Sequence, residues 1–285
     1  DTHVIGVCQP AVPVFAAVSL MATENDPNQP LSMTLMGGPI DTRVSKTQVT
    51  ELAEQRDLQW FIDNVIYDVP YLYPGAGRAV YPGFIQLGGF MSMNLDRHIH
   101  SHFKFYQHLV QGDGDSASAH RKFYNEYLSV MDIDKAFYIQ TVKTVFQSHD
   151  LPKGNMIWND PYSKDPIPVR PQDIKKTALL TIEGEKDDIS ALGQTTAAHD
   201  LVKNLPANMQ YHHFQLDVGH YGIFNGRRWR EQIMPRLRSF IRKFDPDKDP
   251  VPKRDLKLVP DLKPEKWQKS KHGVQALKTA IKNEK

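Results

Sequence analysis

Short apolar runs and longer segments of helical periodicity alternate along the first part of the chain. A β-branched run at residues 2–7 is followed by an apolar, alanine-rich segment at 12–21, which predicts a helix, and by a second strand-like run at 31–36. A strand, a helix and a strand joined by short turns favour a βαβ unit with parallel strands. The pattern therefore predicts an α/β fold.

The middle of the chain changes character. Apolar residues at helical spacing predict one helix over 45–61, whereas residues 67–90 mix prolines and glycines with aromatic residues and predict a loop-rich segment. Three helical patterns follow, at 90–110, 116–130 and 134–146. We interpret residues 67–150 as a mostly helical cap inserted between the strands of the sheet.

Strand-like patterning resumes after the cap. Residues 176–182 and 211–216 predict two more strands, separated by a helix at 195–205. An amphipathic helix follows at 227–244, and Pro235 is expected to kink or divide it. The sheet core thus comprises residues 1–66 and 151–244.

The last stretch, residues 245–285, is rich in proline and lysine and poor in apolar residues. This composition predicts a basic, solvated tail that is disordered or loosely docked, with a short helix at 273–283. The alternative is a tail that binds an anionic or granule surface.

Composition narrows the classes of function. The 285 residues are 40% hydrophobic and 24% charged with a net charge of +2, which is typical of a soluble globular protein and gives no reason to expect nucleic acid. No apolar run approaches the roughly 18 residues of a membrane span. The single cysteine excludes an internal disulfide and a cysteine-rich zinc site, and it suits a reducing, cytoplasmic location. We predict no cofactor and no metal.

Cys8 is the first candidate catalytic residue along the chain. The strand-like run reaches Gly6, then Cys8, and then a segment able to start a helix. This is the layout of a nucleophile elbow, a sharp strand-to-helix turn that exposes one reactive side chain. The usual motif is G-x-S-x-G; here cysteine replaces serine and Pro10 stands in place of the second glycine. The alternative is that Cys8 is a small buried hydrophobic residue.

A cysteine nucleophile needs a base beside it and an acid that orients the base, and α/β-hydrolases carry them in the order nucleophile, acid, histidine. Asp187 and His220 each lie just after a predicted strand, in that order. We predict that His220 takes the thiol proton and returns it to the leaving alcohol, while Asp187 fixes the imidazole tautomer. Asp188 is the rival acid, and Asp217 is a weaker one because it is too near His220 in sequence.

The backbone N–H of Gln9 is the predicted first donor of the oxyanion hole. The second donor normally comes from an earlier strand–helix loop, and a chain that starts at Asp1 and reaches Cys8 has no room for that loop or for a whole hydrolase sheet. We therefore expect a fragment or a processed chain that lacks the N-terminal strands, with the missing N-terminal half of the same fold as a possible partner.

Two further features have competing interpretations. His98 and His102 are spaced to share one helix face while His100 is not, but without an accompanying carboxylate–histidine motif a polar helix face is favoured over a metal site. The aromatic and methionine-rich run at 71–93 predicts either the core of the cap or an apolar surface for a greasy substrate.

Five stretches carry a family likeness, namely HVIGVCQPAVP, MTLMGGPIDTR, YPGAGRAVYPGFIQLGGFM, EGEKDDISALGQTTAAH and VGHYGIFNGRR. Through them, residues 2 to about 244 resemble the intracellular polyhydroxybutyrate depolymerases of bacteria. The resemblance implies an α/β-hydrolase fold with a cysteine nucleophile, here lacking its N-terminal strands and carrying a helical cap insertion. It also implies that Cys8, Asp187 and His220 are the nucleophile, acid and base.

The resemblance implies a carboxylic ester hydrolase that acts on the polyester storage granule, with the granule surface as its partner. A 3-hydroxybutyrate ester would acylate Cys8, and water or a thiol such as coenzyme A would release the acyl group. Three alternatives remain: a polyhydroxyalkanoate synthase, which usually shows G-x-C-x-G-G instead of the Gln9-Pro10-Ala11 found here; a non-catalytic granule-binding protein; and a hydrolase of small esters or lactones.

Overall fold

The computed structural model describes residues 2–162 and 165–246, so nearly all of the predicted basic tail at 245–285 lies outside the described residues. The chain forms two compact units, one made of the residues before 53 and after 143 and the other of residues 53–143. In the described ranges, every helix is too short or too polar to cross a bilayer.

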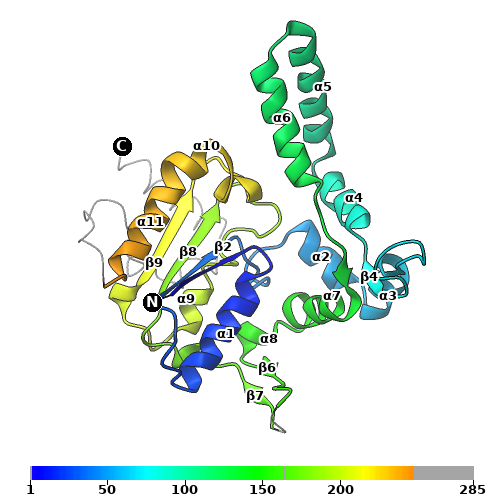
Figure 1. Ribbon diagram of the computed structural model, residues 1–285. Coiled ribbons are helices and arrows are strands. Elements are labelled where there is room, and N and C mark those ends of the chain that lie inside the picture. The colour runs from blue at the N-terminus through cyan, green and yellow to red at the C-terminus, as the bar shows by residue number, and fades with distance from the viewer. Residues whose placement is uncertain (1, 163–164, 247–285) are drawn as a thin grey trace. The chain divides into compact units, whose positions relative to one another are not determined.

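A four-stranded parallel sheet is the centre of the first unit (Figure 1). Its strands lie in the order β1 (His3–Val7), β2 (Ser32–Met36), β8 (Ala178–Gly184) and β9 (Gln210–Gln215). These are the four strands that the sequence predicts, and the fold class is confirmed as α/β. Every residue of β2 and β8 is buried, as expected for the middle strands of a parallel sheet with helices on both faces.

Alternation along β8 sends neighbouring side chains into two different cores. Leu179 packs in one cluster with apolar residues of α1 (Ala11–Thr23). The same cluster contains Ala198 of α9 (Ala198–Leu201) and Val202 and Leu205, which follow α9. Leu180 packs in the other with α11 (Met234–Lys243), on the opposite face of the sheet. Each fully buried large side chain contributes about 1.5–3 kcal/mol to these clusters.

Short elements complete the first unit. The C-terminal helix is divided as Pro235 predicts, because a residue without an N–H suits the first turn of α11 and not a helix interior. The predicted helix over 195–205 is wrong outside α9, because residues 195–200 close tight turns with bonds to the residue three before, and Val202 leaves the helical conformation at a ψ of 53°. The remaining elements are α8 (Asp150–Lys153), β6 (Ile157–Trp158), β7 (Ile167–Pro168), α10 (Gly226–Arg228), 3-10 turns at Pro171–Asp173, Ala207–Met209 and His220–Ile223, and a π-helical turn at Trp229–Ile233.

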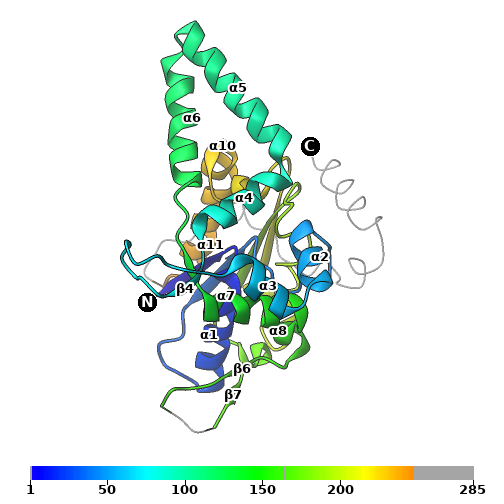
Figure 2. The same ribbon diagram turned by 90° about the vertical axis from the view of Figure 1, so that its right-hand side faces the viewer.

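The second unit is mostly helical, and it is inserted in sequence between β2 and β8. A small antiparallel sheet joins β3 (Tyr67–Asp68), β4 (Ala79–Tyr81) and β5 (Ile133–Asp134). Its helices are α3 (Leu58–Val65), α4 (Gly83–Met93), α5 (Leu95–Gln111), α6 (Gly114–Tyr127) and α7 (Lys135–Thr141), with α2 (Gln48–Gln55) and a π-helical turn (Val142–Gln147) at its borders. Figure 2 shows α5 and α6 as a long antiparallel hairpin.

Two predictions for this region are wrong in detail. The single helix predicted at 45–61 is two helices, because the carboxylate of Asp57 accepts the backbone N–H of Trp60 and starts α3 afresh. The loop predicted at 67–90 ends early, because α4 begins after Pro82 and the Asp132 carboxylate accepts the Gly83 N–H at 2.8 Å.

Candidate active site

Cys8 occupies the turn between β1 and α1. Its φ angle is +60°, a left-handed conformation that costs a residue with a Cβ about 1–2 kcal/mol. The Cys8 N–H donates to the Met36 carbonyl at 2.8 Å, which fixes the turn to the end of β2. Gly6 is required beneath it, because a Cβ there would lie 2.8 Å from the Cα of Ala11. The turn therefore has the strained geometry of a nucleophile elbow.

Asp187 lies in the loop after β8, and its side chain is buried. One carboxylate oxygen, Oδ1, accepts the backbone N–H groups of Ile189 at 3.0 Å and Ser190 at 2.8 Å. These bonds hold the carboxylate so that Oδ2 lies 2.8 Å from Nδ1 of His220. The rival Asp188 is exposed, so the structure brings His220 together with Asp187.

His220 begins the 3-10 turn that follows β9, and its ring is buried beside the rings of Tyr221 and Phe224. Gly37, directly after β2, packs against the Asp187–His220 pair. Gly37 has φ +52°, and a Cβ there would lie 3.2 Å from Cε1 of His220 and 3.3 Å from Oδ2 of Asp187. Only glycine fits this position without displacing the pair.

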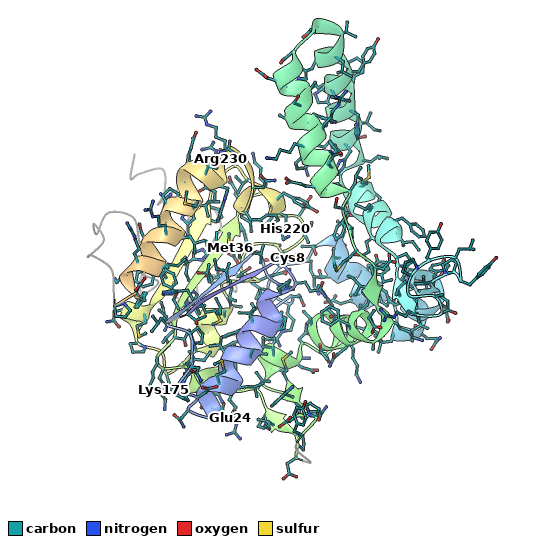
Figure 3. All side chains as sticks on the ribbon, in the orientation of Figure 1. Cys8, Glu24, Met36, Lys175, His220 and Arg230 are labelled. Atoms are coloured by element: carbon teal, nitrogen blue, oxygen red, sulfur yellow. The ribbon has the colours of Figure 1, made fainter. Side chains whose placement is uncertain are left out.

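Cys8 and His220 lie beside each other (Figure 3), and their side chains are hydrogen-bonded. Because Asp187 occupies Nδ1, the bond to the thiol falls to Nε2 of His220. Burial lowers the pKa of His220, but the hydrogen bonds to Asp187 and Cys8 and the negative charge of both outweigh it and raise the pKa to about 10. The arrangement therefore favours the protonated form of the His220 ring.

The site therefore places a sulfur that can act as a nucleophile, on Cys8, in contact with a ring that can donate a proton, on His220. Cys8 is only partly buried. The N-terminus of α1 follows directly and places the positive end of its dipole near the same point. A thiolate, an imidazolium and an orienting carboxylate are the components of covalent acyl transfer.

The other predicted site residues lie elsewhere or have other partners. Gln9 follows Cys8 at the elbow and is partly buried. Asp217 is exposed and bonds Lys186 at 2.9 Å. His98 is buried against the Tyr124 hydroxyl at 2.9 Å, and the ring of His102 lies 4.3 Å from the ring of Tyr124. Within residues 2–162 and 165–246, no group of three or more histidine, cysteine or acidic side chains is arranged to hold a metal ion.

Two functional features were missed by sequence reasoning. Gly37 appeared only as part of the turn after the predicted strand at 31–36, and Glu183 only as the residue after the predicted strand at 176–182. Glu183 is completely buried and accepts three backbone N–H groups. A charged residue at the end of an otherwise apolar strand is the only signal that the sequence offers for it.

An elbow, an acid loop and a histidine loop, in that order along a parallel sheet with helices on both faces, define an α/β-hydrolase fold. The family described as PHB de-polymerase C-terminus matches residues 37–245, well over half of the chain, and the chain belongs to this family. The match begins after Cys8 and includes Asp187 and His220.

Solved structures of three bacterial proteins are similar to the chain at low sequence identity. They are a candidate non-heme bromoperoxidase, BpoC, from Mycobacterium tuberculosis (13% identity, TM-score 0.45, covering 85% of this chain and 67% of that one), Rv0554 from the same organism (14%, 0.40, 83% and 64%) and a candidate lipase, lip1, from Acinetobacter baumannii (13%, 0.35, 84% and 60%). A comparison with curated protein sequences finds no match.

Proposed function

We propose that the chain cleaves ester bonds of poly(3-hydroxybutyrate) through Cys8, His220 and Asp187, by way of an acyl-cysteine intermediate. The observation that carries the proposal is the hydrogen-bonded series from the Asp187 carboxylate through the His220 ring to the Cys8 thiol at a strained elbow. Membership of the PHB de-polymerase C-terminus family supports the choice of polyester as the substrate.

In the first half-reaction, the Cys8 sulfur attacks the ester carbonyl and forms a tetrahedral intermediate. The intermediate collapses when the C–O bond breaks, and His220 donates the Nε2 proton to the departing alkoxide. The products are a thioester on Cys8 and a free hydroxyl end of the polymer. Asp187 holds the ring in the tautomer that this transfer needs and does not itself take the proton.

In the second half-reaction, His220 takes a proton from water, and the resulting hydroxide attacks the thioester carbonyl. The C–S bond breaks, the acid product leaves, and Cys8 regains its proton through His220. A thiol such as coenzyme A can replace water, giving a hydroxyacyl thioester instead of the acid. We propose the Gln9 N–H as one donor to the oxyanion in both halves, with a contribution of about 3 kcal/mol.

The proposed partner is the granule surface, and exposed apolar residues of the second unit support it. On α5, five exposed side chains recur every three or four residues and define the α5 stripe: Leu95, Ile99, Phe103, Tyr106 and Val110. Residues 71–73, in the turn between β3 and β4, are also exposed and apolar. An amorphous polyester presents methyl groups and ester carbonyls, so an apolar face that carries few carboxylates suits it. We propose a cytoplasmic, granule-associated location on the same grounds.

The first experiment measures 3-hydroxybutyrate release from native amorphous granules by the parent chain and by Cys8→Ala. We expect release by the parent and a loss of at least about 10³-fold in the variant, because the covalent route needs the sulfur. Release that persists in Cys8→Ala would overturn the proposed nucleophile. No release by either chain, with granule binding intact, would favour the granule-binding alternative, and polymer growth from a hydroxyacyl thioester would favour the synthase.

The granule contact is tested separately in the Cys8→Ala background by co-sedimentation. Ile99→Glu with Val110→Glu should weaken binding by about 100-fold, since two apolar contacts of roughly 1.5 kcal/mol each are lost. Gln107→Glu, an exposed change on the polar side of α5, is the matched control and should bind like its parent. Equal binding by all three would place the contact elsewhere.

A further inference from the structure

Glu183 is the last residue but one of β8. Its side chain is completely buried at the end of an apolar strand. Oε1 accepts the backbone N–H groups of Thr195 and Thr196, each at 2.9 Å, and both carboxylate oxygens lie 3.1 Å from the N–H of Gly193. Every one of these partners donates to the carboxylate, which is the pattern expected for an ionised group.

Burying a carboxylate at the end of a strand costs desolvation free energy. Burial raises the pKa of Glu183, while hydrogen bonds from Thr196, Gly193 and Thr195 act in the opposite direction. An apolar side chain would fill the same space without this cost. The carboxylate therefore serves to hold the N–H groups of Gly193, Thr195 and Thr196, and so closes the loop that leaves β8 and carries Asp187.

The same loop is tied to the other side of the candidate site. The Gly38 N–H donates to Oγ1 of Thr195 at 2.8 Å, and the Thr195 hydroxyl donates to the Gly38 carbonyl at 3.0 Å. Gly38 follows Gly37, the residue against which the Asp187–His220 pair packs. The Cβ position of Gly38 also lies 3.0 Å from the carbonyl oxygen of Cys8. A continuous series of contacts thus runs from Glu183 through Thr195 to the elbow.

We propose that Glu183 is a positioning residue for Cys8, His220 and Asp187. Its carboxylate holds the loop after β8 in the shape that brings Asp187 to His220, and through Thr195 it fixes the Gly37–Gly38 turn between this pair and Cys8. The proposal rests on the proposed function for the roles of the three residues. Glu183 itself contacts none of the reacting atoms.

The test uses the full chain and reads the site without any substrate. Cys8 is the chain's only cysteine, so alkylation by iodoacetamide reports on this sulfur alone. The rate is followed against pH for the parent, Glu183→Gln and Asp187→Asn. We expect Glu183→Gln to slow alkylation at pH 7 by roughly 10- to 100-fold and to move its pH profile towards that of Asp187→Asn, because misplacement by about 1 Å costs up to 10²-fold.

A matched pair of threonines tests the route. Thr195→Val removes the bonds to Gly38, whereas Thr177→Val removes an equally buried bond from Oγ1 to the Pro30 carbonyl near the other end of β8. We expect Thr195→Val to slow alkylation by about tenfold, Thr195→Ser to restore it, and Thr177→Val to leave it unchanged. This series also carries the test if Glu183→Gln fails to fold by circular dichroism.

A folded Glu183→Gln with the parental alkylation profile would overturn the proposal, and so would equal effects of Thr195→Val and Thr177→Val. Ester hydrolysis is measured on the same variants. If the parent cleaves no ester while the alkylation profiles differ as expected, the proposed function fails and the positioning role stands. If the parent cleaves polyester and the profiles coincide, the positioning role fails alone.

Discussion

Two histidines near the end of the sheet have similar burial, but their pKa values are shifted in opposite directions. His212 lies within β9 and His220 in the turn after it, and their exposed fractions are 7% and 5%. Burial lowers the pKa of His212 to about 4. Burial acts in the same direction on His220, but Asp187 and Cys8 reverse the outcome and raise its pKa to about 10. Burial alone therefore does not decide the charge of a histidine in this protein.

The difference lies in what each ring contacts. Nδ1 of His212 lies 2.8 Å from the Thr181 hydroxyl and 3.3 Å from that of Thr196, and Nε2 has no partner among the described residues. Thr181 also bonds His199 at 2.9 Å, whose pKa burial lowers to about 3. An imidazolium must donate from both nitrogens, and His212 has no acceptor for the second proton. His220 differs from it by two partners, the Asp187 carboxylate at 2.8 Å and the Cys8 sulfur.

The strongest way to break this contrast is Asp187→Asn, which leaves His220 buried without its acid. The pKa of His220 should fall, and kcat/KM for ester cleavage should drop by about 10³- to 10⁴-fold because the ring loses its orienting acceptor. Steady-state kinetics and an NMR titration of the ring measure both effects. Asp188→Asn is the control and should stay within about 2-fold, as surface changes usually do; a larger loss in the control would reassign the acid.

A smaller effect is expected for His212, on the free energy of unfolding. His212 is neutral when folded and has an ordinary pKa of 6.5 when unfolded, so the unfolded chain binds more protons below pH 6.5. The free energy of unfolding should therefore decrease as the pH falls from 6.5 towards 4, by roughly 3 kcal/mol from this residue at about 1.4 kcal/mol per pH unit.

His212→Gln should remove that part of the pH dependence, measured by urea unfolding at several pH values. Exposed His100→Gln is the control and should follow the parental curve. Parallel curves for the parent and His212→Gln would show that acid sensitivity comes from other groups.

The smallest effect is expected from breaking the solvent-exposed ion pair between Lys186 and Asp217. Lys186 and Asp217 lie 2.9 Å apart but are 63% and 60% exposed, so solvent screens their attraction. Lys186→Ala should leave the midpoint of thermal unfolding and the alkylation rate of Cys8 unchanged. A clear loss in either would mean that the charge of this loop, and not only the buried Asp187, sets the state of His220.

The sheet and the elbow could be predicted because their signals are local. A β-branched run, a glycine and an alanine-rich segment lie next to one another in sequence, and each is confirmed as strand, turn or helix. The order of the acid and the histidine follows from strand ends in the same way. Asp187 and Asp188 are adjacent, however, and only the turn that binds Ile189 and Ser190 decides which carboxylate points inwards.

What the sequence could not give depends on contacts between distant segments. The helix expected at 195–205 is confirmed only at Ala198–Leu201, and the side chain of Thr195, just before it, bonds to Gly38, which is 157 residues away in sequence. His212 and His220 both lie in aromatic, partly polar surroundings in the sequence. The opposite shifts of their pKa values depend in large part on a carboxylate 33 residues from His220, which no local pattern reveals.

The insertion of the second unit between β2 and β8 determines the order in which the chain can fold. These strands pair from Ser32 with Ala178 to Met36 with Ile182, so residues 37–177 must close as one loop. Closing this loop costs less conformational entropy when part of it has already folded, because each doubling of the length of flexible chain adds about 0.6 kcal/mol. We expect pulse-labelled amides of α5 and α6 to gain protection before Leu179. In that order of folding, the βαβ unit that carries Cys8 would form before Asp187 and His220 reach it, and we expect a half-folded chain to lack the proposed activity.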